Sequence, residues 1–259
     1  MSPYDVVVRP VRFTDGLDQM RGFLETLGLQ ARIESERGGW VDMVAGSGMV
    51  ALHSAATSNT GARAGETRLS FEGLDLDRLT DELRAAGFAD ATVWDEAYGR
   101  VLSVTDPLGD QIWVDGYDDD NYGFRVHEPE RDTRLSVMPV RFADPVGQMR
   151  GFLEAFGLAA RPVGQEEHDD PRQFAVYGGH TGLVALHPPL QTSQIITGPG
   201  AVQLGFETQE PLAELADRLT VAGHRDAVVR SEVFGQRLDV TDPDGQPVLV
   251  RPAPPPDSP

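Results

Sequence analysis

The chain has 259 residues, of which 40% are hydrophobic and 24% are charged, a composition typical of a soluble globular protein with two domains of ordinary size. Asp and Glu number 41 against 22 Lys and Arg, so the formal net charge is -19 at pH 7. A surface this acidic repels phosphate backbones and attracts cations, and we expect no nucleic-acid partner.

Two residue types are missing, and each absence excludes a class of chemistry. There is no cysteine, which excludes thiolate catalysis, iron–sulfur clusters and disulfides. All 22 basic residues are arginine, which excludes Schiff-base chemistry and a P-loop lysine. The N-terminal sequence MSPYDVVVRP has neither a basic segment nor a long apolar run. We therefore expect a cytoplasmic protein without a membrane partner.

An internal repeat organises the chain. Three pairs of segments recur in the same order at offsets of 129, 134 and 136 residues, and 16 of 24 positions are identical in the first pair. The pairs are residues 9–32 with 138–161, 48–53 with 182–187, and 104–109 with 240–245. The sequence therefore predicts a duplicated domain, with repeats at 1–120 and 133–252, an acidic linker at 121–132 and a disordered Pro-rich tail at 253–259.

The first module of repeat one begins with the β-rich run VVVRPVRF. Asp15 is expected to cap a helix whose apolar residues recur at three- and four-residue spacing, and Gly28 to end it. In repeat two, Pro145 after Asp144 suits the first helical position. Three short strands are expected near 30–36, 40–45 and 49–53.

The second module repeats this order. The strand TRLSFEG precedes a helix with Leu76, Leu79 and Leu83 on one face, and Gly87 is expected to end that helix. The VTDPLG segment predicts a chain reversal before the last strand. The pattern βαβββ occurs twice per repeat and four times per chain, which predicts an α+β fold.

The VRF-x-D segment before the first helix and the late DPxG hairpin resemble the vicinal oxygen chelate superfamily. That superfamily includes glyoxalase I, the bleomycin-resistance proteins and the extradiol dioxygenases. The resemblance implies that two βαβββ modules form one cup-shaped mixed sheet with the ligand inside the cup, and that this chain is a tandem member with two such domains.

The resemblance also implies metal-ligand positions on the first and last strands of each module. In this sequence they fall on Val8, His53, Arg68 and Trp113 in repeat one and on Val137, His187, Gln203 and Leu249 in repeat two. Most of these side chains cannot coordinate a metal ion. We therefore expect two metal-free cups and no cofactor.

Strand alternation predicts which residues face the cups, with Val8, Pro10 and Arg12 sharing one face. The expected ligand-binding residues are Arg12, His53, Arg68, Glu72, Trp113, Arg141, His187 and Gln203.

Most of these residues have two interpretations. His53 is the candidate catalytic base, and His53 and His187 are alternatively strand-end residues retained through duplication. Arg12 and Arg141 either bind a substrate carboxylate or pair with Glu72 and Glu207. Trp113 either stacks on a planar or cationic ligand or fills the space of the metal. The acidic runs at 118–120 and 166–170 are interpreted as solvated.

The favoured hypothesis is a metal-free binding protein that sequesters or carries a planar or cationic antibiotic-like small molecule. One alternative is a metal-independent enzyme in which His53 is the base and Arg68 or Arg12 stabilises an oxyanion. Another is a glyoxalase- or dioxygenase-type metalloenzyme with ligands at other positions, and a third is a regulatory protein with vestigial cups. The chain is expected to be a monomeric pseudo-dimer or a homodimer.

Overall fold

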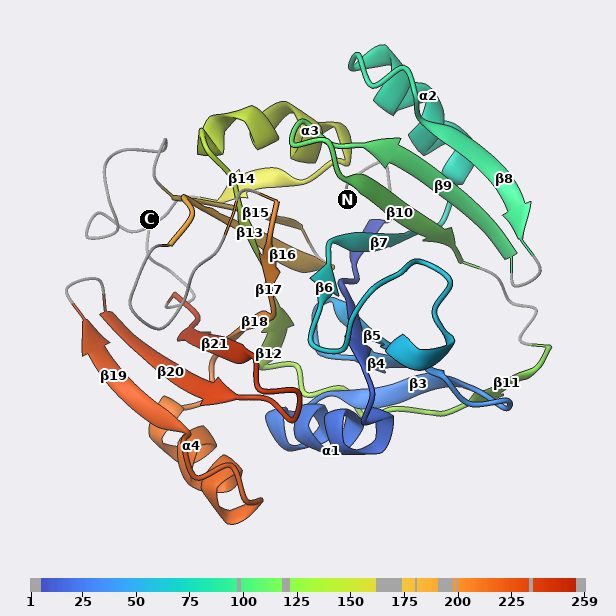
Figure 1. Ribbon diagram of the computed structural model, residues 1–259. Coiled ribbons are helices and arrows are strands. Elements are labelled where there is room, and N and C mark those ends of the chain that lie inside the picture. The colour runs from blue at the N-terminus through green and yellow to red at the C-terminus, as the bar shows by residue number, and fades with distance from the viewer. Residues whose placement is uncertain are drawn as a thin grey trace. The chain divides into compact units, whose positions relative to one another are not determined.

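The structure is a computed structural model that describes residues 6–96, 99–117, 122–161, 174–179, 181–190, 198, 200–232 and 235–254. It confirms the expected α+β class, with four sheets and four α-helices in the described ranges (Figure 1). No helix within these ranges is long and apolar enough to cross a membrane.

The βαβββ pattern occurs four times, as expected. In the first half, the modules are β2 (Val11–Thr14), α1 (Leu17–Leu27), β3 (Gln30–Ser35), β4 (Trp40–Val44) and β5 (Met49–Ser54), followed by β6 (Thr67–Arg68), β7 (Ser70–Gly73), α2 (Leu76–Ala85), β8 (Thr92–Glu96), β9 (Gly99–Thr105) and β10 (Gln111–Gly116). A short 3-10 helix, η1 (Ala55–Thr57), follows β5, and the linker strand β11 (Phe124–Val126) follows β10.

The second half repeats the order. Its modules are β13 (Val140–Phe142), η2 (Val146–Met149), α3 (Arg150–Ala155), β14 (Ala159–Arg161), β15 (Ala175–Gly179) and β16 (Gly182–His187), followed by β17 (Val202–Gln203), β18 (Gly205–Thr208), α4 (Leu212–Val221), β19 (Val228–Glu232), β20 (Gly235–Thr241) and β21 (Pro247–Pro252). Each half begins with a short strand, which is β1 (Val6–Val8) in the first half and β12 (Leu135–Val137) in the second.

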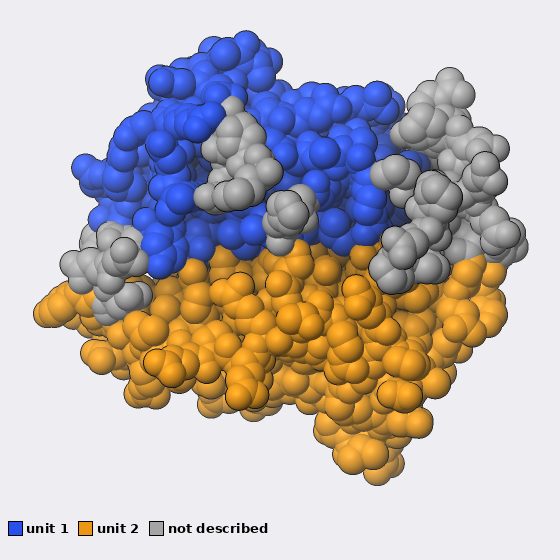
Figure 2. All heavy atoms as spheres, turned by 180° about the vertical axis from the view of Figure 1, so that it is seen from behind, with its two compact units in different colours: residues 1–10, 68–120, 139–202 blue, residues 11–67, 121–138, 203–259 orange. Residues whose placement is uncertain are grey.

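The chain forms two compact units, and each unit combines one module from each half (Figure 2). Unit 1 comprises Met1–Pro10, Arg68–Asp120 and Pro139–Val202, and unit 2 comprises Val11–Thr67, Asn121–Met138 and Gln203–Pro259. The two compact units therefore do not coincide with the two sequence repeats, whose boundaries stay a prediction.

Unit 1 contains the sheets β1-β7-β10-β9-β8 and β14-β15-β16-β13-β17. Its core joins α2 and α3, where the rings of Phe71 and Phe156 stack at 4.5 Å between centroids. Unit 2 contains the sheets β11-β3-β4-β5-β2-β6 and β12-β18-β21-β20-β19. Its core joins α1 and α4, and includes the fully buried Leu24 and Leu219.

A proline divides the first strand of each half between the two units. Before Pro10, β1 pairs with β7 in unit 1, and after it β2 pairs with β5 in unit 2. Pro139 separates β12 from β13 in the same way. Proline has no N–H for a sheet ladder, so a strand is readily interrupted there. The two prolines thus mark the crossing points of the chain.

The helix boundaries follow local signals with two exceptions. Gly28 ends α1 at φ 115°, as expected, because glycine accepts the left-handed conformation without a Cβ clash. The expected cap at Asp15 is wrong: Gly16 is the N-cap, and Thr14 Oγ1 accepts a hydrogen bond from the Gly16 N–H at 3.0 Å. In repeat two, Pro145 precedes the first turn instead of starting it.

In each unit, one buried arginine–aspartate pair holds the two modules together. In unit 2, Arg12 of repeat one donates to Asp242 of repeat two, and both side chains are at most 2% exposed. In unit 1, Arg141 of repeat two donates to Asp106 of repeat one, with the same burial. Each aspartate belongs to a VTDP segment, so the same motif pair joins the repeats in both directions.

The second carboxylate oxygen of each aspartate closes its own turn. Asp106 Oδ1 accepts from the N–H groups of Leu108 and Asp110 at 2.9 and 3.0 Å. Asp242 Oδ1 accepts from Asp244 and Gln246 at 3.0 and 2.9 Å. The VTDP aspartates therefore fix both the local turn and the contact between modules.

We predict that Arg12→Ala destabilises the protein by about 3–5 kcal/mol, because it leaves a buried carboxylate without its cation. Burial already raises the pKa of Asp242, although Arg12 acts in the opposite direction. Urea unfolding measures the effect. The control is Arg21→Ala, since Arg21 and Glu25 form an i,i+4 pair with side chains 28% and 45% exposed, for which less than about 1 kcal/mol is expected. Equal effects of the two substitutions would refute the prediction.

An acid-sensitive contact recurs before the last hairpin of each half. Asp90 Oδ2 accepts from Thr105 N–H at 2.8 Å, and Asp226 Oδ2 accepts from Thr241 N–H at 2.8 Å. The hydrogen bonds from Thr105 lower the pKa of Asp90 from 3.8. Burial raises the pKa of Asp226, but the hydrogen bonds from Thr241 lower it by more, so the pKa of Asp226 is also lowered.

A lowered folded-state pKa means that ionised Asp90 stabilises the fold above pH 3.8, and that this contribution is lost as the pH falls through the lowered value. We predict that Asp90→Asn is less stable than wild type at pH 6 and that the difference shrinks as the pH drops below 3.8. Urea unfolding of both proteins from pH 6 to pH 2.5 tests this. A difference that stays constant over the titration would contradict it.

Candidate functional site

Each sheet packs one face against its helix and turns the other face away from it. In unit 2, Val41, Val50 and Leu52 lie on the helix side, in the core with α1. Because side chains alternate along a strand, Trp40 and His53 lie on the opposite face. We call this opposite face the helix-free face of a sheet.

His53 lies between two aromatic rings on the helix-free face of unit 2. Its ring centroid is 5.5 Å from that of Phe13 and 5.5 Å from that of Trp40. Strand register explains the cluster, because His53 of β5 is directly opposite Phe13 of β2 and Trp40 of β4. All three positions are therefore fixed by the sheet.

The backbone also determines which nitrogen of His53 is available for chemistry. Nδ1 is 2.8 Å from the carbonyl oxygen of Ser54. A carbonyl oxygen only accepts, so Nδ1 carries the hydrogen and donates it. In the neutral ring, Nε2 then holds the lone pair. A histidine held in this way is suited to act as a base or as a ligand.

Repeat two has the same arrangement at His187, in unit 1. Nδ1 of His187 is 2.6 Å from the carbonyl oxygen of Pro188, and its ring lies 6.0 Å from Phe142 and 6.1 Å from Phe174. Phe174 takes the place of Trp40. The geometry of both histidines is thus repeated, whereas the aromatic rings around them differ.

A buried ion pair lies on the same face as His53. Arg32 donates to Asp42 at 2.9 Å, and the Asp42 side chain is fully buried. Asp42 is on β4, two residues after Trp40. The corresponding residue of repeat two is Val176, so this carboxylate is specific to repeat one.

Trp113 lies on the helix-free face of the β7-β10-β9-β8 sheet in unit 1. Its ring meets that of Trp94 edge to face, with centroids 5.8 Å apart. The Trp94 indole N–H donates to Glu96 at 2.6 Å. Because Trp113 is half-buried in a pair of indoles, it is available both for packing and for a ring-shaped ligand.

The equivalent face of repeat two has a different character. Arg230 and Leu249 occupy the positions of the two tryptophans. Arg230 and Arg237 both donate to Asp239, at 2.8 and 3.2 Å. This helix-free face is therefore aromatic in repeat one and charged in repeat two.

The structure corrects the expected side-chain orientations around Pro10. Val8 is fully buried in the core of unit 1, so the expectation that Val8, Pro10 and Arg12 share the ligand face is wrong. Arg12 extends from β2 to Asp242, away from the face that carries Phe13. Alternation places Val7 and Arg9 on the helix-free face instead.

The expected arginine partners are also wrong. Arg12 pairs with Asp242 and Asp244 rather than with Glu72, and Arg141 pairs with Asp106 and Asp110 rather than with Glu207. Glu72 pairs with Arg9 at 3.8 Å. The repeated VRF arginines are thus occupied by the fold, and neither is placed to bind a substrate carboxylate.

Several sequence-based assignments stay predictions. Arg68 and Gln203 are half-buried at the ends of β6 and β17, and their role in ligand binding is still an expectation. Residues 118–120, 166–170 and most of the tail at 253–259 lie outside the described residues.

The metal set implied by the superfamily does not fit the residues present. Within the part of the chain that the structure describes, no three His, Asp or Glu side chains are grouped as a metal site would require. Moving the first-strand position by one residue brings in Val7 or Arg9, and Ser136 or Met138 in repeat two. None of these offers an imidazole or carboxylate donor.

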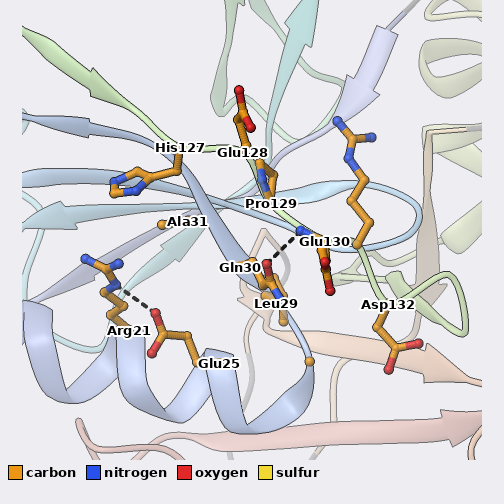
Figure 3. Close-up of a pocket in the computed structure, with 12 residues that line it drawn as sticks. Arg21, Glu25, Leu29, Gln30, Ala31, His127, Glu128, Pro129, Glu130 and Asp132 are labelled. Atoms are coloured by element: carbon orange, nitrogen blue, oxygen red, sulfur yellow. Dashed lines mark hydrogen bonds and ion pairs between the residues drawn. The ribbon is translucent and has the colours of Figure 1, made fainter.

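A groove of about 710 Å³ lies in unit 2, between α1, the start of β3 and the linker after β11 (Figure 3). Charged side chains dominate its lining, which includes Arg21, Glu25, His127, Glu128, Glu130 and Asp132. None of the residues expected to bind a ligand lines this groove.

Sequence reasoning missed three residues of these faces. Trp40 was not among the residues expected to bind a ligand, yet it lies against His53. Asp42 and Arg9 were not considered, although each is a nearly buried charge with an ion-pair partner. Both residues lie in β-rich segments, and a charged side chain within a buried strand requires a partner of opposite charge. That pattern could have marked Asp42 and Arg9 as members of ion pairs.

Comparisons with known proteins identify the fold. Neither a protein-family model nor a curated protein matches this sequence. Among solved structures, homoprotocatechuate 2,3-dioxygenase from Arthrobacter globiformis is similar with a TM-score of 0.59 and 18% identity, covering 98% of this chain and 81% of its own.

Two further solved structures have a similar fold. A variant of the Brevibacterium fuscum enzyme of the same name, in complex with HPCA, has a TM-score of 0.59 and 17% identity, covering 94% of this chain and 69% of its own. A xylose isomerase-like TIM barrel/4-hydroxyphenylpyruvate dioxygenase fusion protein has a TM-score of 0.62 and 11% identity, covering 100% of this chain and 50% of its own.

These similarities overturn the favoured functional hypothesis. A metal-free protein that sequesters or carries an antibiotic-like molecule was expected, but the similar solved structures include extradiol ring-cleaving dioxygenases that cover 94–98% of this chain. Structural similarity at sequence identities of 11–18% establishes only the fold. The chain therefore has the mixed α+β fold of the extradiol dioxygenases, which are proteins of the vicinal oxygen chelate superfamily.

Proposed function

We propose that this chain is an enzyme of the dioxygenase type whose substrate is a small hydroxylated aromatic molecule. The observation that carries the proposal is the His53 cluster, a histidine with a defined tautomer between two aromatic rings. The fold similarity to ring-cleaving dioxygenases along 94–98% of the chain supports the same class.

In this proposal His53 handles the proton of the substrate. Nδ1 stays hydrogen-bonded to the Ser54 carbonyl while Nε2 accepts the proton of a substrate hydroxyl. The substrate then becomes a phenolate, which is more electron-rich than the neutral phenol. Trp40 and Phe13 would hold the substrate ring beside the imidazole. Dioxygen is the co-substrate of this reaction class. No step is assigned to a metal, because the described donor set does not fit one.

A second candidate is an oxygen-independent enzyme that uses His53 as its base. The incomplete donor set favours it, since proton abstraction needs only the lone pair of Nε2 and a stabilised product anion. The two candidates share a site and differ in the consumption of dioxygen.

Oxygen uptake with a panel of catechols, hydroquinones and aromatic 2-oxo acids distinguishes them. Product analysis with and without air, and with and without added Fe²⁺ or Mn²⁺, completes the test. Turnover that requires air supports the dioxygenase type, and turnover without air supports the second candidate. Absence of turnover with every compound and metal would refute both.

We predict that His53→Gln lowers kcat/KM by about 10²–10⁴-fold, the usual effect of losing a general base. The matched control is His187→Gln, which removes the equivalent histidine of repeat two and should leave at least half of the activity. Steady-state kinetics on the substrate found in the panel measures both. A larger loss in His187→Gln than in His53→Gln would move the site to the other half of the chain.

Substrate binding beside Trp40 can be observed separately from turnover. The chain has three tryptophans, and Trp94→Phe with Trp113→Phe leaves Trp40 as the single reporter. We predict that an aromatic substrate quenches its fluorescence in a saturable way and that the quenching persists in His53→Gln. Saturable binding without any quenching of Trp40 would place the substrate elsewhere.

A further inference from the structure

A charged cluster lies on the helix-free face of unit 1, on three neighbouring strands. Arg9 follows β1, Glu72 lies on β7 and Asp115 lies on β10. Arg9 donates to Asp115 and lies 3.8 Å from Glu72. The Arg9 side chain is 3% exposed and that of Glu72 is 9% exposed, so both charges are nearly desolvated.

The strands that carry this cluster are those from which the superfamily takes metal ligands. Glu72 and Asp115 are register partners on parallel strands, so their carboxylates are side by side. Two adjacent carboxylates repel one another, and because Glu72 is nearly buried the pair requires a cation. In unit 1 a guanidinium supplies that positive charge.

Repeat two supports this interpretation through a compensated exchange. Met138 occupies the position of Arg9, and its N–H donates to the Gly205 carbonyl at 2.9 Å, as that of Arg9 does to Ser70 at 3.0 Å. Glu207 retains the glutamate. Its register partner on the last strand is Arg251, in place of Asp115.

The two halves therefore keep the glutamate and take the arginine from opposite sides of it. In repeat one the guanidinium comes from the first strand, and in repeat two the strand register places Arg251 of the last strand beside Glu207. Each change alone is unfavourable. Losing Arg9 removes the cation beside the carboxylates, and replacing Asp115 by arginine puts a second guanidinium beside that of Arg9. Together they again leave one arginine beside one glutamate on neighbouring strands. The retained element is the pair of charges, whichever strand supplies the arginine.

We propose that a resident guanidinium takes the place of a metal ion on these faces, as the counter-charge of Glu72 in unit 1 and of Glu207 in unit 2. Removal of Arg9 leaves Glu72 and Asp115 as a two-carboxylate site for a divalent cation. This inference is independent of the proposed enzymatic function, and none of its measurements uses activity.

Four variants test the inference by thermal unfolding in EDTA. Arg9→Met, which imports the residue of repeat two, should lower Tm by roughly 6–12 °C. Adding Asp115→Arg to Arg9→Met reproduces the arrangement of repeat two and should return Tm to within about 3 °C of wild type. Arg251→Met should lower Tm as Arg9→Met does. Arg9→Lys keeps a positive charge and should lose less than half as much.

Mn²⁺ provides the second readout. Arg9→Met should regain most of its lost Tm in 1 mM Mn²⁺ and bind one ion by EPR titration, whereas wild type and the Arg9→Met/Asp115→Arg variant should do neither. The control is Arg32→Met, which exposes the single carboxylate of Asp42 and should not be rescued.

Three results would overturn the inference: equal Tm values for Arg9→Met and the double variant, equal stabilisation of wild type and Arg9→Met by Mn²⁺, or equal losses in Arg9→Lys and Arg9→Met. If Arg9→Met is insoluble, Arg9→Lys and the double variant still decide the matter. A soluble, stable double variant then supports the inference, and an insoluble one refutes it.

Discussion

The pairing of Arg12 with Asp242 and of Arg141 with Asp106 is the interaction on which the rest of the structure depends. Each pair is almost fully buried and joins a first strand of one repeat to a hairpin turn of the other. A buried charge without its partner is far more costly than an exposed one, so each pair links the stability of one module to the presence of the other. The core under α1 and α4 lies in the same unit as the Arg12–Asp242 pair, and the core under α2 and α3 lies in the same unit as the Arg141–Asp106 pair.

Local patterns accounted for much of the fold. The alternating and three-to-four-residue spacings predicted the strands near 30–36, 40–45 and 49–53 and the helix ending at Gly28, because those signals lie within a few residues of one another. The face of the first strand was predicted wrongly. Pro10 interrupts the ladder there, and a shift of one residue moves every side chain to the opposite face.

The candidate site was less accessible to sequence reasoning for a different reason. His53 was recognisable because ALH recurs in both repeats, but its contact with Trp40 depends on hairpin register, and its tautomer depends on a backbone carbonyl. The partners of Arg12 lie 230 and 232 residues away along the chain. The recurring VTDP segment singles out Asp106 and Asp242, but nothing in the local sequence shows which arginine each of them pairs with.

The division of each first strand at a proline has a consequence for the order in which the protein can form during synthesis. Unit 1 ends at Val202, whereas unit 2 needs segments from Val11 to beyond Asp242. As the ribosome releases the chain from its N-terminus, unit 1 has all its parts first, while β2 to β5 wait for the last hairpin. Such distant pairings close slowly, because long loops must be ordered before their contacts form. Residues 11–67 therefore stay without their partner module until most of the chain has been synthesised.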